Sequence, residues 1–278
     1  MIPSHLLRYR TCVFLTLAFL MMRCGRSDLS TGSVTDPALI QVTIEVHRRV
    51  CYDGNSSSIK AFLKDGAGKT IANKAIQIRV NGKPMRLNNG SSNYYGAFPY
   101  YELLADSPET VLGGATYAFS MVLTDGNEYN IGRIQTQPDL TSQQILLPPS
   151  HSRKQPLAVQ WQQVEPGNFW TAFQKRWQGE TSHSQLTISK VNEKKDKWGN
   201  DIQDESSANE ADYLTVEVGR GSDSYTIPIT YFQQPLADFN ALSLLLTSIR
   251  TVKPDGTFRT GSAITSEHST FYKVKITD

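Results

Sequence analysis

The chain has 278 residues, of which 39% are hydrophobic and 10% aromatic, and this composition supports packed cores and excludes wholesale disorder. Its 28 basic and 26 acidic residues nearly cancel, to a net charge of +2. Because no run of Lys and Arg could follow a polyanion, the charge pattern argues against nucleic acid as a partner.

The N-terminus has the pattern of a secretory signal peptide. His5, Arg8 and Arg10 form a basic region, and an apolar run follows over residues 11–22. This run of about 12 residues falls short of the roughly 20 that a membrane-spanning helix needs. Residues 1–23 are therefore predicted to be a signal peptide, and no later segment is long and apolar enough to span a bilayer.

Cys24 follows the apolar run directly, where a bacterial lipoprotein carries the cysteine that receives its lipid. Residues 24–37 would then be a flexible tether, since they are polar and rich in Ser, Thr and Gly. Arg23 departs from the small residue usual before such a cysteine, and the alternative is an ordinary cleaved signal beside an incidental cysteine. Lipidation predicts a cell-envelope protein, held in the outer membrane by palmitate-type chains on its periplasmic or outer side. Cys51 is then left without a disulfide partner.

Residues 38–149 are predicted to form an antiparallel Ig-like β-sandwich. Apolar and polar residues alternate with the period of a half-buried strand at four places. These places are 40–46, 59–63, 76–80 and 117–123. Asn81-Gly82 and Asp125-Gly126 supply residues that tolerate positive φ in tight hairpins, and the chain after Asn81-Gly82 is expected to return through Met85 and Leu87. Short strands with turn residues between them are typical of a sandwich.

Prolines interrupt this pattern, and residues 150–156 are predicted to be a Pro-rich linker. Residues 157–278 are predicted to form a second Ig-like or fibronectin type III-like sandwich. Its strands are expected around 157–161, 186–188, 214–218, 226–232, 242–252 and 271–276. One short helix is expected over 168–179, where Trp170, Phe173 and Trp177 would share a face. The polar stretch 190–211 is expected to be a long exposed loop.

The turn and strand motifs resemble those of tandem immunoglobulin-like lipoproteins of Bacteroidota. The run Leu63 to Lys69 with the strand 75–78 looks like the strand, turn and returning strand of bacterial Ig-like modules. Residues 114–119 with Thr124-Asp125-Gly126 are similar to the penultimate hairpin of such domains, and Val159-Gln160-Trp161 is similar to the Trp-bearing early strand of fibronectin type III-like folds. The resemblance implies a cell-surface module of two sandwiches. It carries no functional residue.

The sequence offers no catalytic or metal-binding motif. The Gly-x-Ser-x-Gly elbow of hydrolases is missing, and the histidines outside the signal peptide are widely spaced, at His47, His151, His183 and His268. None forms an H-x-H or H-x-x-x-H pair, so each is interpreted as a solvated or hydrogen-bonded surface histidine. The prediction is a protein that is not an enzyme and that uses no cofactor or metal.

Aromatic residues are the candidate ligand contacts. Residues 93–101 hold five rings, among them Tyr94, Tyr95, Tyr100 and Tyr101. Adjacent tyrosines in a strand face opposite sides, so one of each pair should be exposed or at an edge. Exposed rings suit stacking on sugars or on a protein partner, and the alternative is that these rings fill a sandwich core. Trp161, Trp170 and Trp177 are expected in the core, and Trp198, in a polar stretch, is a further candidate contact.

These features together predict a non-catalytic envelope lipoprotein that acts as a binding or structural module. Its possible partners are a glycan or another envelope protein, besides the membrane through the lipid. Two alternatives remain: a fimbrial or adhesin subunit that assembles by strand exchange, and a carbohydrate-binding accessory lipoprotein of a polysaccharide uptake system.

Overall fold

The computed structural model describes residues 32–51, 54–90, 98–103, 111–139, 145–161, 180–195, 201–204, 213–218, 224–233, 239–254, 256 and 258–278. This part of the chain is all-β, as predicted, with a 3-10 turn at Pro37–Leu39 and a four-residue helix, α3, at Ile229–Phe232. Within these ranges no helix has the length and apolar character needed to cross a membrane.

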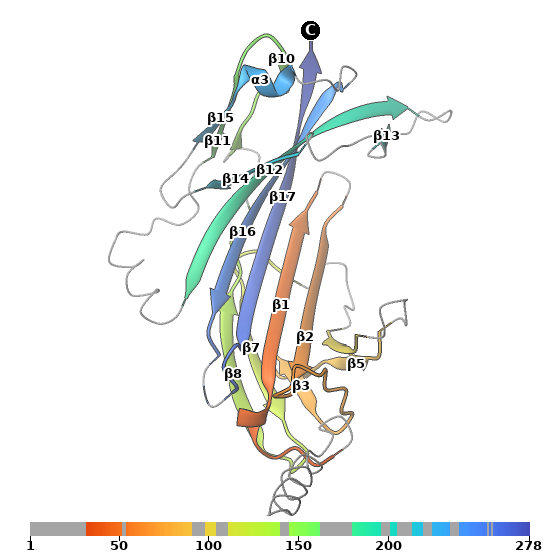
Figure 1. The fold of residues 1–278 in the computed structure, drawn as a ribbon, viewed down its shortest axis with the longest axis vertical. Helices are drawn as coiled ribbons and strands as arrows, with labels where there is room; N and C mark the ends of the chain where they lie inside the picture. The colour runs from red at the N-terminus through yellow and green to blue at the C-terminus, as the bar shows by residue number, and fades with distance from the viewer. Residues whose placement is uncertain are drawn as a thin grey trace, which may run out of the picture.

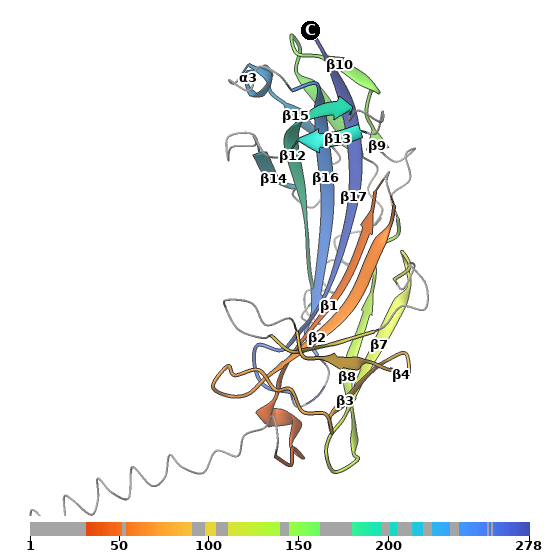
Figure 2. The same ribbon diagram turned by 90° about the vertical axis from the view of Figure 1, so that its right-hand side faces the viewer.

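A ten-stranded sheet, which we call the spine, runs the length of the molecule (Figure 1). Its main path is β13 (Asp201–Asp204), β12 (Thr181–Lys195), β16 (Ala241–Val252), β17 (Ala263–Thr277), β1 (Gln41–Val50), β2 (Ser56–Lys64), β6 (Tyr100–Glu102) and β5 (Arg86–Asn88). Two further strands join it, β14 (Tyr213–Val218) on β12 and β10 (Ser150–Ser152) on β17. Figure 2 shows β16 and β17 running past β1 and β2 from one end of the molecule toward the other.

Two smaller sheets pack on the spine. One has the order β4 (Lys83–Pro84), β3 (Gln77–Val80), β7 (Thr116–Val122), β8 (Glu128–Gln135), and the other has the order β15 (Ser224–Ile227), β11 (Leu157–Trp161), β9 (Ile145–Leu146). The first encloses a core with residues such as Ile44 and Phe119, and the second a core with residues such as Ile188 and Leu244. Each end of the spine is thus one layer of a sandwich.

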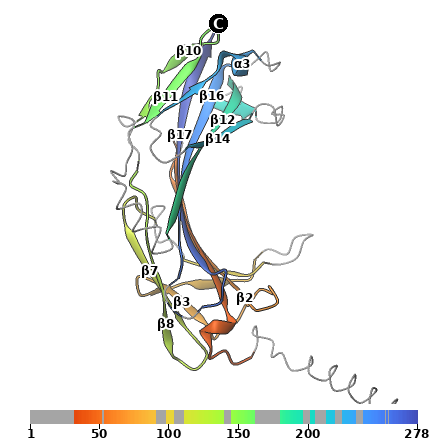
Figure 3. The ribbon, with the colours of Figure 1, turned by 60° about the vertical axis from the view of Figure 1, so that its left-hand side comes forward.

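Both cores lie on the same face of the spine. Along β17, Ile264 belongs to the first core, while Val274 and Ile276 belong to the second. Side chains alternate between the faces of a strand, so these even-numbered positions point the same way. Figure 3 shows β7, β8 and β11 on one side of the curved long strands. We call this the core face and the opposite one the open face; no described sheet packs on the open face.

The spine joins the two predicted sandwiches through a parallel pair of strands. β1 and β17 pair from Thr43↔Ala263 to Val50↔Thr270, whereas the sequence predicted antiparallel sheets throughout. β17 also pairs antiparallel with β16 over its length. The domain limits 38–149 and 157–278 remain a prediction, but strands from both ranges are neighbours in one sheet, and two tandem Ig-like domains are not established.

The segment predicted as a linker lies partly in the spine. Ser150–Ser152 forms β10 and pairs in parallel with Lys275–Thr277 of β17. The prediction rested on flanking prolines, which remove ladder donors only at their own positions. The three residues between them keep their N–H groups, and they extend the sheet.

The first hairpin follows its turn chemistry and then departs from the expected path. Asn81 and Gly82 have φ of 48° and 77°, which confirms the predicted positive-φ turn. The return strand β4 ends at Pro84, which has no N–H to donate. Met85 still contributes to the first core, and the chain then enters the spine as β5, paired with β6. One expected strand is therefore two short strands in different sheets.

Four predictions in the second half have different outcomes. Residues 226–232 are not one strand, because Pro228 follows β15 and precedes helix α3. Residues 190–211 are not one loop, because β12 continues to Lys195 and pairs with β13. A hairpin can form through backbone hydrogen bonds alone, without an apolar face. Its sequence then shows no alternation of apolar and polar residues that would predict the strands. Trp161 lies in the second core, as predicted, while the predicted helix 168–179, with Trp170 and Trp177, lies outside the described residues.

Candidate binding surface

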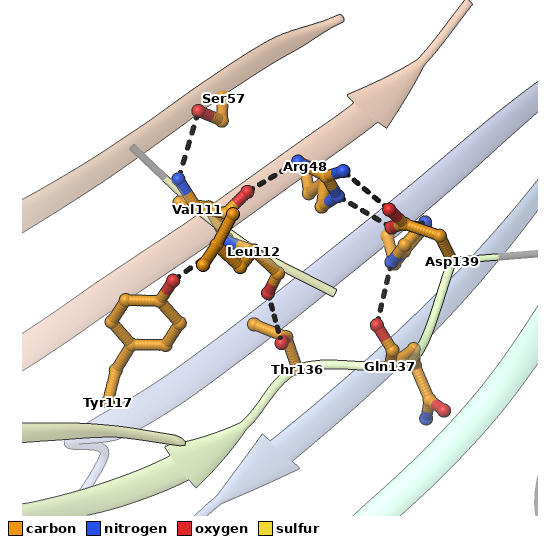
Figure 4. A network of polar contacts seen from close by, with 9 residues as sticks. Arg48, Ser57, Val111, Leu112, Tyr117, Thr136, Gln137 and Asp139 are labelled. Carbon is orange, nitrogen blue, oxygen red and sulfur yellow. Dashed lines mark hydrogen bonds and ion pairs between the residues drawn. The ribbon is translucent and has the colours of Figure 1, made fainter. Parts of the chain in front are cut away.

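Between the two cores, the core face carries a buried polar cluster that we call the waist (Figure 4). Arg48 of β1, 6% exposed, donates from Nε to Asp139 Oδ1 at 2.6 Å and from Nη2 to Asp139 Oδ2 at 2.5 Å. Its Nη1 donates to the carbonyl of Val111. A bidentate pair of this kind fixes both distance and orientation, and it holds the segment after β8 against β1.

Two neighbouring strands of the spine hold the same segment. His268 of β17 donates from Nδ1 to the carbonyl of Gln137 at 3.0 Å, and its Nε2 lies 3.4 Å from Asp139 Oδ1. On β16, Arg250 donates from Nη1 to the carbonyl of Gln135 at 3.0 Å, and its Nε lies 2.9 Å from Glu180 Oε1. Residues 135–139, which lead from one core to the other, are therefore fixed to three adjacent strands.

Burial and pairing act in opposite directions on the ionisable groups of the waist. Burial lowers the pKa of His268, although the Asp139 carboxylate partly offsets this. The hydrogen bonds from Arg48 lower the pKa of Asp139, against the effect of its own burial. Burial also lowers the pKa of Arg250. In the neutral range, Arg48 and Asp139 are thus a charged pair beside a neutral imidazole.

Because Arg48 points to the core face, its neighbours on β1 point to the open face, where the structure has a hollow of about 340 Å³. The hollow crosses the middle of the spine, over four adjacent strands. Its open-face lining is His47 and Arg49 from β1, Ser56 and Ser58 from β2, Leu245 from β16, and Glu267, Ser269 and Phe271 from β17.

The ionisable side chains of the hollow differ in their neighbours. His47 lies between two carboxylates, with Nε2 3.3 Å from Glu45 Oε2 and Nδ1 3.5 Å from Glu267 Oε2. The Arg49 guanidinium lies 4.2 Å from the centre of the Phe271 ring, a cation–π distance. Among the residues that the structure describes, no carboxylate lies within ion-pair distance of Arg49.

The floor of the hollow is a hydroxyl group. Ser269 is 5% exposed. Its Oγ lies 3.0 Å from Thr247 Oγ1 and donates to Glu267 Oε1 at 3.4 Å. Because a hydroxyl can both donate and accept, this chain of side chains can rearrange its hydrogen bonds around a polar ligand.

A group of rings lies further along the same open face. The Tyr100 ring of β6 is 5.9 Å from the Phe62 ring, and Lys60 Nζ is 5.2 Å from the Tyr100 centroid. Asn88 Nδ2 donates to the Tyr100 hydroxyl at 3.2 Å. Phe62 lies four residues after Ser58 on β2, so this ring group, Phe62 with Tyr100, is about 13 Å from the hollow at ~3.3 Å per residue.

The predicted contact residues divide between the two faces. Tyr100 is half-buried on the open face, whereas Tyr101 is 2% exposed and donates to the Asn73 carbonyl at 2.8 Å. This confirms that the adjacent pair faces opposite sides and shows that Tyr101 is a core residue; burial also raises its pKa above the ordinary range. Tyr94, Tyr95, Trp198 and the predicted lipidation site Cys24 lie outside the described residues.

Sequence reasoning did not find the hollow. The sequence interpretation of His47 is a solvated or hydrogen-bonded surface histidine, and it does not single out Arg49, Glu267 or Ser269. The available signal was the outward-facing series Glu45, His47 and Arg49 on one strand, where polar residues alternate with the buried Val46 and Arg48. Within the described ranges, no three His, Cys, Asp or Glu side chains gather in a way that could hold a metal ion.

Comparison with known proteins gives a weak likeness to solved structures. The chain matches no protein-family model and no curated protein. Among solved structures it is similar to SGBP-B of the Bacteroides ovatus mixed-linkage glucan utilization locus, in complex with a mixed-linkage heptasaccharide. The identity is 13% and the TM-score 0.18, and the match covers 80% of this chain and 52% of that one. The chain thus spans about half the length of that structure, and the likeness carries no argument on function.

Proposed function

We propose that this chain is a non-catalytic binding module of the cell envelope, and that its ligand is a glycan lying on the open face. One observation carries the proposal: both cores and both smaller sheets occupy the core face. The opposite face keeps a hollow and a group of rings among polar side chains. A sheet face that contacts only solvent requires neither a hollow nor a group of rings.

The position of the hollow favours a glycan over an extended peptide. A peptide that adds a strand needs an unpaired sheet edge. In the middle of the hollow, β17 is paired with β16 on one side and with β1 on the other, and β1 is also paired with β2. A ligand there meets side chains, and the lining of hydroxyls, a carboxylate, an imidazole and a guanidinium matches a polyhydroxylated molecule.

The fimbrial alternative needs a strand that can exchange between subunits. β17 is the strand nearest the C-terminal end of the described chain, and it lies in the interior of the spine, with twelve residues paired to β16 and eight to β1. Its removal would open both cores. The geometry therefore supports a ligand-binding face rather than donor-strand assembly.

The test is binding to a panel of neutral and acidic oligosaccharides, measured by isothermal titration calorimetry on the purified protein. We expect Tyr100→Ala to weaken binding by roughly three- to tenfold, because a stacking ring contributes about 0.5–1.5 kcal/mol, and Tyr100→Phe to retain most of it. Ser58→Trp, which fills the hollow, should abolish binding. Failure of every glycan to bind, or full affinity in Ser58→Trp, would contradict the proposal, as would ligand cleavage detected by mass spectrometry.

The envelope location rests on Cys24, and it has a separate test. Several acyl chains, at about 0.8 kcal/mol per buried methylene, hold a protein in a bilayer almost permanently. We expect Cys24→Ser to move the protein from the membrane fraction to the soluble fraction, as measured by fractionation and immunoblotting. A variant that still sediments with membranes would place the anchor elsewhere.

A further inference from the structure

We propose that the hollow selects an acidic sugar, a uronate residue whose carboxylate pairs with Arg49. This inference rests on the proposed function and narrows it to a ligand class. It starts from the different neighbours of the ionisable side chains around the hollow, where His47 Nδ1 lies 3.5 Å from Glu267 Oε2. Arg49 has an aromatic neighbour but no carboxylate at ion-pair distance among the described residues.

Arg49 lies over the Phe271 ring at the hollow. The Arg49 guanidinium carbon lies over the Phe271 ring, 4.2 Å from its centre, a cation–π distance. A guanidinium has five N–H donors, and it can bind a planar carboxylate through two of them. The contact with the ring also restricts the side chain before the ligand arrives, so less conformational entropy is lost on binding.

The rest of the lining can form hydrogen bonds with sugar hydroxyls. Across β1, Arg49 lies between Ser56 of β2 and Ser269 of β17 in the strand register. One register step away, His47 lies between Ser58 and Glu267. Ser56 and Ser269 therefore supply hydroxyl groups beside Arg49 in the register, and Glu267 can accept from a sugar hydroxyl one step further on.

The size of the hollow limits the ligand. At about 340 Å³ it lies at the lower end of the ~300–1,000 Å³ typical of ligand sites. It suits one or a few sugar residues, with the rest of the chain free to continue over the open face toward Tyr100.

The experiment compares charged and uncharged forms of the same sugars. Oligomers of galacturonate, glucuronate and mannuronate, and their methyl esters, are titrated into the purified full chain by calorimetry. We expect at least one acid to bind about tenfold or more tightly than its ester, with the advantage falling as salt is raised. Arg49→Gln should remove this preference while binding to the ester is retained, and Arg49→Lys should keep only part of it. Arg79→Gln, in β3 of the smaller sheet, is the matched control and should behave as wild type.

The outcomes separate the inference from the proposed function. If esters and neutral glycans bind as well as the acids, or if Arg49→Gln keeps the preference, the uronate inference is wrong and the glycan function stands. If sulfated sugars bind and uronates do not, the inference is also wrong, because a carboxylate is not what Arg49 selects. If no saccharide binds, the proposed function fails and the inference fails with it.

Discussion

The residues at the waist join the two halves of the molecule with charged groups instead of apolar ones. Arg48 and Arg250 are 6% and 5% exposed, and each is bound to a backbone carbonyl and to a carboxylate. A buried pair of this kind adds little net stability over apolar packing, but loss of one partner is costly. The main effect of the waist is therefore to fix the position of the segment 135–139. It adds little to the unfolding free energy of the protein.

The unfolding free energy should fall in acid because of His268. Its pKa is lowered from 6.5 in the folded state by burial, so the unfolded chain binds the proton more readily. The contribution of neutral His268 to the unfolding free energy is fully present above about pH 6.5. This contribution is lost as the pH falls from there through the pKa of His268 in the folded state. The charged groups around it are Arg48, Asp139 and, one strand away, the Arg250–Glu180 pair.

Urea unfolding at a series of pH values measures this effect. His268→Asn should remove the loss that begins near pH 6.5, and His183→Asn, at an exposed position, should leave it in place. A further loss, as the pH falls below 3.8, should remain in both variants, because the lowered pKa of Asp139 stabilises the folded state only while its carboxylate is charged. An unchanged pH profile in His268→Asn would contradict this account.

Removal of the charge on Asp139 should destabilise the protein more than removal of a surface charge. Breaking a buried ion pair costs roughly 3–5 kcal/mol, and we expect about 2 kcal/mol for Asp139→Asn because this side chain is 40% exposed. Glu128→Gln breaks an ion pair with Arg79 whose side chains are 35% and 49% exposed and should cost less than about 1 kcal/mol. Equal losses in the two variants, measured by denaturant unfolding, would show that the waist pair acts like a surface pair.

At the scale of elements, local chemistry predicted the strands and turns of the first half well. Alternation located β1, β2, β3 and β7 because each buries one face against the first core. Asn81-Gly82 predicted its turn because few other residues adopt positive φ. Local sequence patterns failed where tertiary contacts determine the structure. After Pro84 the chain passes from one sheet to another. In the β12–β13 hairpin, the residues are polar and show no apolar periodicity.

The turn at Asn81-Gly82 gives a direct test of backbone strain. Gly82 has φ of 77°, and nothing lies within 4 Å of the position that a Cβ would occupy. Gly82→Ala should therefore meet no clash and still cost about 1 kcal/mol, because an L-residue is strained in this region. Thermal unfolding measures the effect. A variant as stable as the wild type would mean that the turn readily adopts another conformation.

The candidate site could not be predicted because it depends on which strands are neighbours. β1 and β17 lie about 220 positions apart in the chain, and no local pattern reports such a pairing. Without it, His47 and Glu267 are two isolated polar residues. Once the strands are paired, the two lie directly opposite each other, beside Ser58.

At the scale of the whole molecule, the shared spine should make the two cores unfold together. Val274 is fully buried in the second core, and Ile264, on the same strand, is fully buried in the first. Val274→Ala should cost about 2 kcal/mol and raise amide hydrogen exchange in β1 and β7 as well as in β11. Faster exchange confined to the second core would show that the cores are independent.

For the proposed envelope protein, the parallel pairing of β1 with β17 would also affect export. A chain that crosses a membrane with its N-terminal residues first would deliver β1 long before residues 263–270 follow. Until then, one edge of β1 has no partner, and the first core lacks Ile264. Such a delay keeps the polypeptide extended during translocation, but it leaves a strand edge exposed to aggregation. A holdase chaperone that covers β1 in this interval would remove that hazard.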